Sequence, residues 1–356
     1  MTGSTNAPTE GPLTFEELAL ATRNRGMPLE ALAYDLTPTG FHYLLIHFDI
    51  PHIDASAWRL NISGDVARPA TLSLDQIRAM KRVEHIVTLE CAGNGRARLS
   101  PRPVSQPWLY EAIGTARWAG TPLRDVLQAV GVDPGAVEAV FAGADRGIQG
   151  DVEHAYARSL TLDDAMRDEV LLAYEMNGEP LQPQHGFPLR LIVPGWYGMT
   201  SVKWLHSIQI TSTPFEGYQQ AVAYHYQRDE DDPGEPVSRI RSRALMIPPG
   251  IPSFFTRERT VESGAVTLAG RAWCGLAPVR TVEVGVDDVW FPAQLDEPIG
   301  PFAWRAWRFE WEATPGAHTL SCRATDEAGS SQPTEQPWNY QGLGNNLVQE
   351  VQVTVR

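Results

Sequence analysis

Residues 83–96 read VEHIVTLECAGNGR and decide how the first half of this sequence folds. Val83 to Leu89 is an apolar run rich in β-branched residues, which predicts a buried strand. The run ends at Glu90-Cys91, and a segment with two glycines follows. Gly93 and Gly95 allow the backbone to come close to a bulky group. We therefore expect Cys91 to stand at a strand exit, where a ligand can approach.

Cys91 carries the most reactive side chain of this segment. Arg96 brings a positive charge that favours the thiolate, the form of cysteine that binds metals or attacks electrophiles. A single cysteine is nevertheless more often an inert core residue, and spacing alone leaves that alternative as the more frequent one. Cys274 and Cys322, the other two cysteines, are too few and too scattered for a disulfide scaffold, and we expect them to be buried free thiols.

The sequence around this segment predicts short helices and strands. Residues 1–12 are polar and are expected to be disordered. Ser73 to Gln76 has the pattern of a capping box, and Thr121-Pro122 combines a capping residue with a first-turn proline in a helix that ends at Gly131. We further expect a helix at 14–21, an extended segment at 41–50, and strands at 58–62, 140–144, 170–174, 189–193 and 202–210.

A second group of polar residues lies in residues 185–205, which read HGFPLRLIVPGWYGMTSVKWL. Arg190 interrupts an apolar strand, and a buried arginine needs an anionic partner. His185, Ser201 and Lys203 lie on either side of the same glycine-containing turn. Such a set suits a phosphate. A structural ion pair between Arg190 and one of the 43 acidic residues is an equally good interpretation at this point.

The character of the sequence changes after Gln227. Residues 228–252 contain an acidic run and several prolines, which indicates a hinge between domains. Farther on, apolar residues alternate with others, as in Val282-Val284-Val286 and Val351-Val353-Val355. This two-residue period, with Gly and Pro turns, predicts a β-sandwich of immunoglobulin-like size. We place the first domain at residues 13–240 and the second at residues 241–356.

Composition and charge exclude several classes of function. With 29 Lys and Arg against 43 Asp and Glu, the formal net charge is −14, which argues against nonspecific binding to nucleic acid or to an anionic membrane. No apolar run approaches the roughly 20 residues of a membrane helix, and no signal peptide is visible, so we expect a cytoplasmic protein. The absence of CxxC, HExxH and GxxxxGK[ST] leaves common zinc sites and the P-loop unsupported.

Several long motifs resemble the sulfite oxidase family of molybdenum-pterin oxidoreductases, in its bacterial form without a heme domain. Residues 87–96 (VTLECAGNGR) resemble the family's molybdenum-ligand segment. Residues 185–205 resemble its pterin-binding segment, and residues 171–181 (LLAYEMNGEPL) resemble the stretch before it. Residues 336–342 (QPWNYQG), followed by Asn345-Asn346, are similar to the end of the family's C-terminal domain. The similarity runs in order from about residue 41 to the C-terminus.

The resemblance implies a fold and a role for each matching residue. The fold is α+β, with a sulfite-oxidase-type molybdopterin-binding domain followed by an immunoglobulin-like β-sandwich that forms a homodimer. Cys91 would bind molybdenum through its thiolate, a soft ligand. Tyr224 would hydrogen-bond near the exchangeable oxygen of the metal, and Arg96 would lie near the substrate. The positions that would hold the pterin and its phosphate are His47, Asp145, His185, Arg190, Ser201 and Lys203.

The sequence departs from the family pattern at two positively charged positions. Leu45 stands where sulfite oxidases have a substrate-binding arginine, and Gly95 stands where they usually have a second arginine. Each lost charged hydrogen bond typically costs roughly 1.5–3 kcal/mol, so we expect sulfite to be a poor substrate and a neutral or larger molecule to fit better. An arginine from elsewhere, such as Arg23 or Arg25, is an alternative source of the missing charge.

The resemblance implies a molybdenum-dependent oxidoreductase that catalyses two-electron oxygen-atom transfer at a molybdenum-oxo centre. The cofactors would be molybdenum and molybdopterin, with no heme, and electrons would pass to or from an external carrier. Tyr224 and Arg96 would stabilise charge and steer a small-molecule substrate. Two alternatives stay open. One is a sulfite oxidase proper, and the other is a catalytically silent protein that binds or stores the cofactor and needs no metal thiolate at Cys91.

Overall fold

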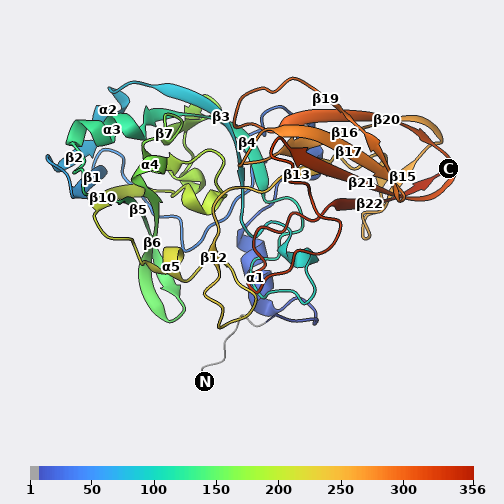
Figure 1. Cartoon of the computed structure of the whole chain (residues 1–356), viewed down its shortest axis with the longest axis horizontal. Helices are drawn as coiled ribbons and strands as arrows, with labels where there is room; N and C mark the ends of the chain where they lie inside the picture. The colour runs from blue at the N-terminus through green and yellow to red at the C-terminus, as the bar shows by residue number, and fades with distance from the viewer. Residues whose placement is uncertain (1–7) are drawn as a thin grey trace.

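The computed structural model describes residues 8–356, and within this range the chain forms two domains that lie side by side (Figure 1). Two sheets, one mixed and one antiparallel, build the first domain. One has the strand order β2 (Ala70–Ser73), β1 (Arg59–Gly64), β10 (Leu205–Thr211), β5 (Glu138–Gln149) and β6 (Val152–Thr161). The other has the order β3 (Val83–Glu90), β4 (Ile113–Pro122), β7 (Leu171–Met176) and β8 (Glu179–Pro180), with β9 (Arg190–Ile192) also paired to β7.

Short helices connect the strands of the first domain. They are α1 (Phe15–Arg23), α2 (Leu74–Arg78), α3 (Leu123–Val130), α4 (Leu162–Ala165) and α5 (Tyr218–Ala221), with 3-10 turns at Leu29–Ala33, Arg96–Arg98, Pro183–His185 and Gly198–Thr200. The capping box at Ser73 is confirmed, because its hydroxyl accepts from the Gln76 amide while the Gln76 side chain accepts from the Ser73 amide. No helix in the described part of the chain is long and apolar enough to cross a membrane.

The second domain is a β-sandwich, as the two-residue period predicts. One sheet has the order β13 (Arg243–Met246), β16 (Gly264–Trp273), β20 (Arg305–Ala313) and β19 (Gln294–Leu295). The other has the order β14 (Ile251–Pro252), β15 (Arg259–Val261), β22 (Gln349–Val355), β21 (Gly316–Asp326), β17 (Val279–Val286) and β18 (Val289–Pro292). Alternate side chains of β22 are buried and share one core with Trp307 and Leu320.

The connection between the domains contains the short hairpin β11 (His225–Tyr226) and β12 (Glu235–Pro236). A third core packs at the junction and includes Met27 from the first domain and Trp273 and Trp304 from the second. The Thr88 amide of β3 also donates to the Phe302 carbonyl at 2.9 Å. The strand that leads to Cys91 is therefore anchored to both domains.

Several local expectations are wrong, each for a physical reason. Residues 9–11 are ordered, because the Thr9 backbone pairs with Arg102 in both directions at 2.8 Å; residues 1–7 of the expected disordered segment lie outside the described residues. The segment 41–50 forms no regular strand, only a bridge from Leu44 to Arg25. Thr121 does not cap α3, because its hydroxyl donates to the Ile77 carbonyl.

Two further expectations need correction. The strand expected at 202–210 begins only at Leu205, since Trp204 has a positive φ of 49°. Both Cys274 and Cys322 are free thiols as expected. Cys322 is buried, but Cys274 is only partly buried, in a groove that borders both domains.

Candidate functional site

Two adjoining clefts meet at Cys91. The inner cleft encloses about 680 Å³ of atom-free space, and its lining includes Cys91, His47, Asp145, His185, Arg190, Ser201, Lys203 and Tyr224. The outer cleft shares Cys91, His47 and Tyr224 with the inner one and adds Arg96, Gln106 and Trp108. The fold thus brings every site residue predicted from sequence to these two clefts, from segments between positions 47 and 224.

Cys91 follows directly on the last residue of β3 and is buried. Its amide donates to the Ala112 carbonyl at 2.9 Å, which continues the pairing of β3 with β4 by one residue. Burial raises the pKa of the Cys91 thiol, and the neighbouring Arg96 guanidinium opposes this rise. Arg96 therefore favours the thiolate as expected, but burial dominates, and a bound cation is needed to make the thiolate the stable form.

Arg190 projects from the first residue of β9 into the inner cleft. The residue is 5 % exposed. Its guanidinium donates to the His185 carbonyl at 3.0 Å and to the Ser201 carbonyl at 3.1 Å, and it lies 4.8 Å from the Trp118 ring centroid. Within residues 8–356 it makes no ion pair, and its Nε is buried without a hydrogen-bond partner. The alternative of a structural ion pair for Arg190 is not what the fold adopts.

Lys203 adds a second buried cation to the inner cleft. Its Nζ donates to the Leu45 carbonyl at 2.6 Å and lies 4.3 Å from the Trp204 ring centroid. Burial and the charge of Arg190 lower the pKa of Lys203 to about 7, against a small opposing effect of Asp145. Burial likewise lowers the pKa of Arg190 to about 10 and raises that of Asp145 to about 6. The cluster therefore holds more positive charge than its own carboxylate neutralises.

The residues of the inner cleft fit a phosphate-bearing pterin. A phosphate would supply the anion that Arg190 and Lys203 lack. The buried Nε2 of His42 is also without a hydrogen-bond partner among the described residues, which offers a polar atom to a heterocycle. Cys91, which lines the same cleft, provides a sulfur for a soft metal. The cations and the His42 ring thus fit the pterin and its phosphate, and the Cys91 sulfur fits the molybdenum.

His47 lies at the rim where the two clefts join. Its Nε2 lies 2.7 Å from Gln149 Oε1, and Gln219 Nε2 lies 3.2 Å from the same ring nitrogen and 2.7 Å from Gln149 Oε1. Burial lowers the pKa of His47 to about 4, so this ring is neutral at pH 7. His154 joins the group through a 3.2 Å contact to Gln219 Nε2, and the rim is polar but uncharged.

Tyr224 stands between the two clefts in a left-handed backbone conformation, with φ of 63°. Such a conformation is uncommon for a bulky residue and often accompanies function. Its amide donates to Gln341 Oε1 at 3.1 Å. Burial and the proximity of Cys91 raise the pKa of Tyr224 to about 12, while Arg158 and a hydrogen bond with Tyr156 oppose the rise.

Arg96 is buried in the wall of the outer cleft. Its Nε donates to the Gln341 carbonyl at 3.0 Å and its Nη1 to the Gln106 carbonyl at 3.1 Å. A Cβ on Gly93 would lie 2.7 Å from this guanidinium, and Gly95 has φ of 89° beside Asn345. Gly93 thus packs against the Arg96 guanidinium and also lines the outer cleft, whereas Gly95 serves a tight turn.

Arg158 lines neither cleft but contacts Tyr224, and sequence analysis missed it. It lies on β6, is 2 % exposed, and its Cζ is 5.7 Å from the Tyr224 ring centroid. It donates to the Gln219 carbonyl, and its Nε is buried without a partner among the described residues. Its only signal was a single charged residue within the otherwise uncharged stretch Ala155 to Leu160. Arg23 and Arg25, the expected sources of extra charge, instead bond to the Phe48 and Gly40 carbonyls and do not line the clefts.

Two family models match this chain, one in each domain. Residues 47–219 match the oxidoreductase molybdopterin binding domain, and residues 254–356 match the Mo-co oxidoreductase dimerisation domain. Human mitochondrial sulfite oxidase is 36 % identical over 347 residues, which cover 90 % of this chain and 62 % of the human protein. Nitrate reductase [NADH] 1 of rice (Oryza sativa subsp. japonica) is 31 % identical over 357 residues, covering 90 % of this chain and 38 % of the reductase.

The fold has a counterpart among solved structures. The sulfane dehydrogenase SoxCD from Paracoccus pantotrophus superposes with a TM-score of 0.81 at 23 % identity, covering 99 % of this chain and 93 % of the other. The two matched models give this chain a molybdopterin-binding domain and a dimerisation domain. This chain belongs to the sulfite oxidase family of molybdopterin enzymes. It spans about three fifths of the length of human sulfite oxidase.

Proposed function

We propose that this protein catalyses two-electron oxygen-atom transfer, in either direction, on a small-molecule substrate other than sulfite. The observation that carries the proposal is the inner cleft, whose lining combines a buried thiol with buried cations that lack a full counter-charge. When bound there, a molybdenum-pterin group supplies the oxygen-atom transfer and stores the two electrons.

Each part of the cleft has a distinct task in this proposal. Arg190, Lys203, His185 and Ser201 hold the phosphate, while His47 and Asp145 contact the pterin. Cys91 offers its sulfur to molybdenum. Tyr224 keeps its proton at pH 7, because its pKa is about 12, and so donates a hydrogen bond to an oxygen that gains negative charge during the transfer.

The outer cleft supports a neutral or larger substrate. It has about 1340 Å³ of atom-free space, and its lining is mostly apolar and aromatic, with Leu45, Phe48, Trp108 and Val222 among its residues. Among the described residues, Arg96 is the only cation in this lining, and two of its donors are already used by backbone carbonyls. A dianion such as sulfite would find few free charged donors there.

Assays with a panel of substrates test this proposal. The purified protein, with molybdenum and pterin quantified, is assayed with sulfite and with S-oxides and N-oxides in the presence of artificial electron carriers. We expect turnover of at least one neutral oxide and sulfite turnover at least 100-fold slower. Sulfite turnover at ordinary enzyme rates would support a sulfite oxidase proper, which the 36 % identity to the human enzyme favours.

Cys91→Ser separates an enzyme from a storage protein. The variant should retain pterin, because the residues that hold the phosphate are unchanged. Its turnover should fall at least 100-fold, because the serine hydroxyl is a harder and weaker donor for the metal. Pterin retention with no active substrate for the wild type, and equal molybdenum retention by the variant, would favour storage.

The proposal also includes a cytoplasmic homodimer, formed through residues 254–356, that exchanges electrons with an external carrier and contains no heme.

A further inference from the structure

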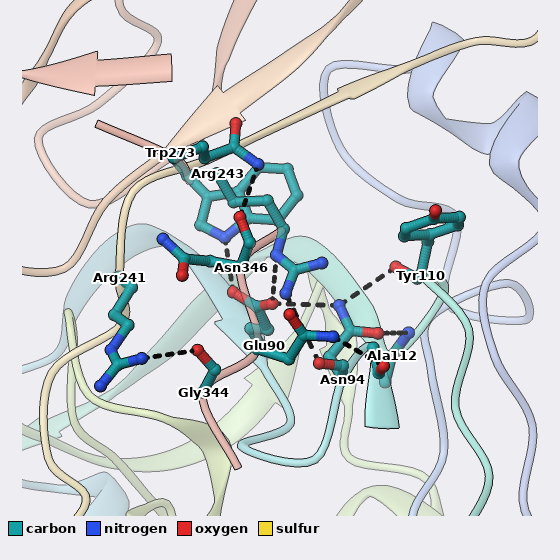
Figure 2. Close-up of polar contacts among 12 residues, drawn as sticks. Glu90, Asn94, Tyr110, Ala112, Arg241, Arg243, Trp273, Gly344 and Asn346 are labelled. Carbon is teal, nitrogen blue, oxygen red and sulfur yellow. Dashed lines mark hydrogen bonds and ion pairs between the residues drawn. The ribbon is translucent and has the colours of Figure 1, made fainter. Parts of the chain in front are cut away.

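A buried ion pair joins the two domains immediately beside Cys91 (Figure 2). Glu90 is the last residue of β3 and precedes Cys91, whereas Arg243 is the first residue of β13 in the β-sandwich. Arg243 Nε lies 2.9 Å from Glu90 Oε1, and the two side chains are 2 % and 1 % exposed. A charge pair buried this completely needs further hydrogen bonds to offset the cost of removing both charges from water.

Both oxygens of the Glu90 carboxylate have further partners. Trp273 Nε1, from the end of β16, donates to Oε2 at 2.8 Å, and Asn94 Nδ2 donates to Oε1 at 3.0 Å. Asn94 continues into the first domain, where its Oδ1 accepts from the Ala112 amide at 3.1 Å and its Nδ2 also donates to the Tyr110 carbonyl. Ala112 in turn accepts the amide of Cys91. Figure 2 shows Arg243 and Trp273 approaching Glu90 on one side and Asn94 on the other.

The C-terminal segment holds the same loop from a different direction. The Gly344 amide donates to the Ala92 carbonyl at 2.7 Å, and Asn345 Nδ2 donates to the Gly95 carbonyl at 2.8 Å. Arg241, two residues before Arg243, donates from Nη1 to the Gly344 carbonyl at 3.1 Å. The loop that follows Cys91 therefore rests on groups contributed by the second domain.

We propose that the Glu90–Arg243 pair is a positioning device through which the β-sandwich sets the orientation of the Cys91 side chain. Neither residue lines the two clefts, so the pair acts through the backbone that Glu90 shares with Cys91. Its two charges fix a direction and a distance that apolar packing would leave adjustable. The C-terminal domain thereby contributes to the active site as well as to assembly. This inference rests on the proposed role of Cys91 as the metal ligand.

Three variants separate positioning from mere stability. Arg243→Met removes the cation and leaves the Glu90 carboxylate buried without a counter-charge. Glu90→Gln combined with Arg243→Met removes both charges and keeps an oxygen that can accept from Trp273. It gives up the hydrogen bond from Asn94 but leaves no unpaired buried charge, so the double variant should be more stable than Arg243→Met. Arg323→Met is the matched control, because it breaks an Arg–Glu pair of 2.7 Å to Glu283 within the same domain, away from the Cys91 loop.

The readout in the loaded protein is the visible absorption band of the sulfur–molybdenum bond, together with molybdenum and pterin content. We expect pterin at wild-type stoichiometry in all three variants. The band should shift or weaken by at least a third in both Arg243→Met and the double variant, and should be unchanged in Arg323→Met. A double variant that is stable and has the wild-type band would overturn the proposal, because a purely structural pair would give that result.

A second readout needs no metal and keeps this test distinct from that of the proposed function. Iodoacetamide modification of Cys91 in the cofactor-free protein, resolved from Cys274 and Cys322 by peptide mass spectrometry, reports how the thiol is held. We expect modification at least 10-fold faster in Arg243→Met and in the double variant than in the wild type or Arg323→Met. Equal rates in all four proteins would overturn the positioning role, even in a protein that binds no molybdenum.

Discussion

The buried arginines of the two domains differ in their partners. In the second domain the buried Arg243, Arg259 and Arg271 each lie beside a carboxylate, at 2.9, 3.6 and 3.1 Å, and all three carboxylates belong to the first domain. Around the clefts of the first domain, Arg96, Arg158 and Arg190 use only backbone carbonyls as acceptors among the described residues. The paired charges join the two domains, whereas an unpaired buried cation such as Arg190 is available to pair with an anionic ligand.

The largest expected effect comes from breaking a paired charge. Arg243→Met should lower the free energy of unfolding by about 3–5 kcal/mol, because it leaves a carboxylate buried without a partner. Denaturant unfolding followed by circular dichroism measures this change, with Arg323→Met, at a partly exposed pair, expected to cost less than about 1 kcal/mol. Equal losses in the two variants would contradict the contrast between them.

Removing an unpaired cation should have the opposite effect on stability. Arg190→Met is expected to stabilise the cofactor-free protein by about 1–2 kcal/mol, since burial already disfavours the charged guanidinium. The same variant should lose most of its bound pterin, because the phosphate loses a charged, directional donor. Thermal unfolding and pterin fluorescence check the two halves of this prediction. A variant that is both less stable and fully loaded would show that Arg190 is a structural residue.

Lys203 makes the comparison dependent on pH. Its pKa of about 7 in the fold lies below the ordinary 10.5 because of burial, then Arg190, with Asp145 opposing. Folding therefore releases a proton between these two pH values, and stability rises with pH across that window. Cofactor-free Lys203→Met should melt several degrees higher than the wild type at pH 6, and this difference should shrink toward pH 10. A difference that is constant from pH 6 to pH 10 would contradict the assignment.

Arg158 is expected to give the smallest effect. Its charge lies behind the Tyr224 ring and counteracts the rise in the pKa of that phenol. Arg158→Met should therefore lower kcat about 10-fold with the substrate found in the panel, and Arg158→Lys about 3-fold, because lysine restores the charge but not the planar group. Steady-state kinetics measure both values, with unchanged pterin content as the control. Equal kcat in the two variants would assign the role to shape rather than to charge.

Much of the organisation is determined locally and could be predicted. Strand β3 and the helix at Ser73 follow from an apolar run and a capping pattern within a few residues. The sandwich follows from a two-residue period, because one face of each strand must be buried. The motifs around Cys91 and Arg190 are also local, so the family could be inferred from these motifs alone, and the matches to both of its domains agree.

Only the tertiary structure decided which charges are paired. Glu90 and Arg243 are separated by more than 150 positions, and no local pattern distinguishes their pairing from the unpaired state of Arg190. Strand β6 places Arg158 beside the Tyr224 ring, and Gly93 packs against the Arg96 guanidinium. Periodicity acts between neighbours along the chain and shapes single elements. The energy of a buried charge depends on what the fold brings within a few ångströms of it.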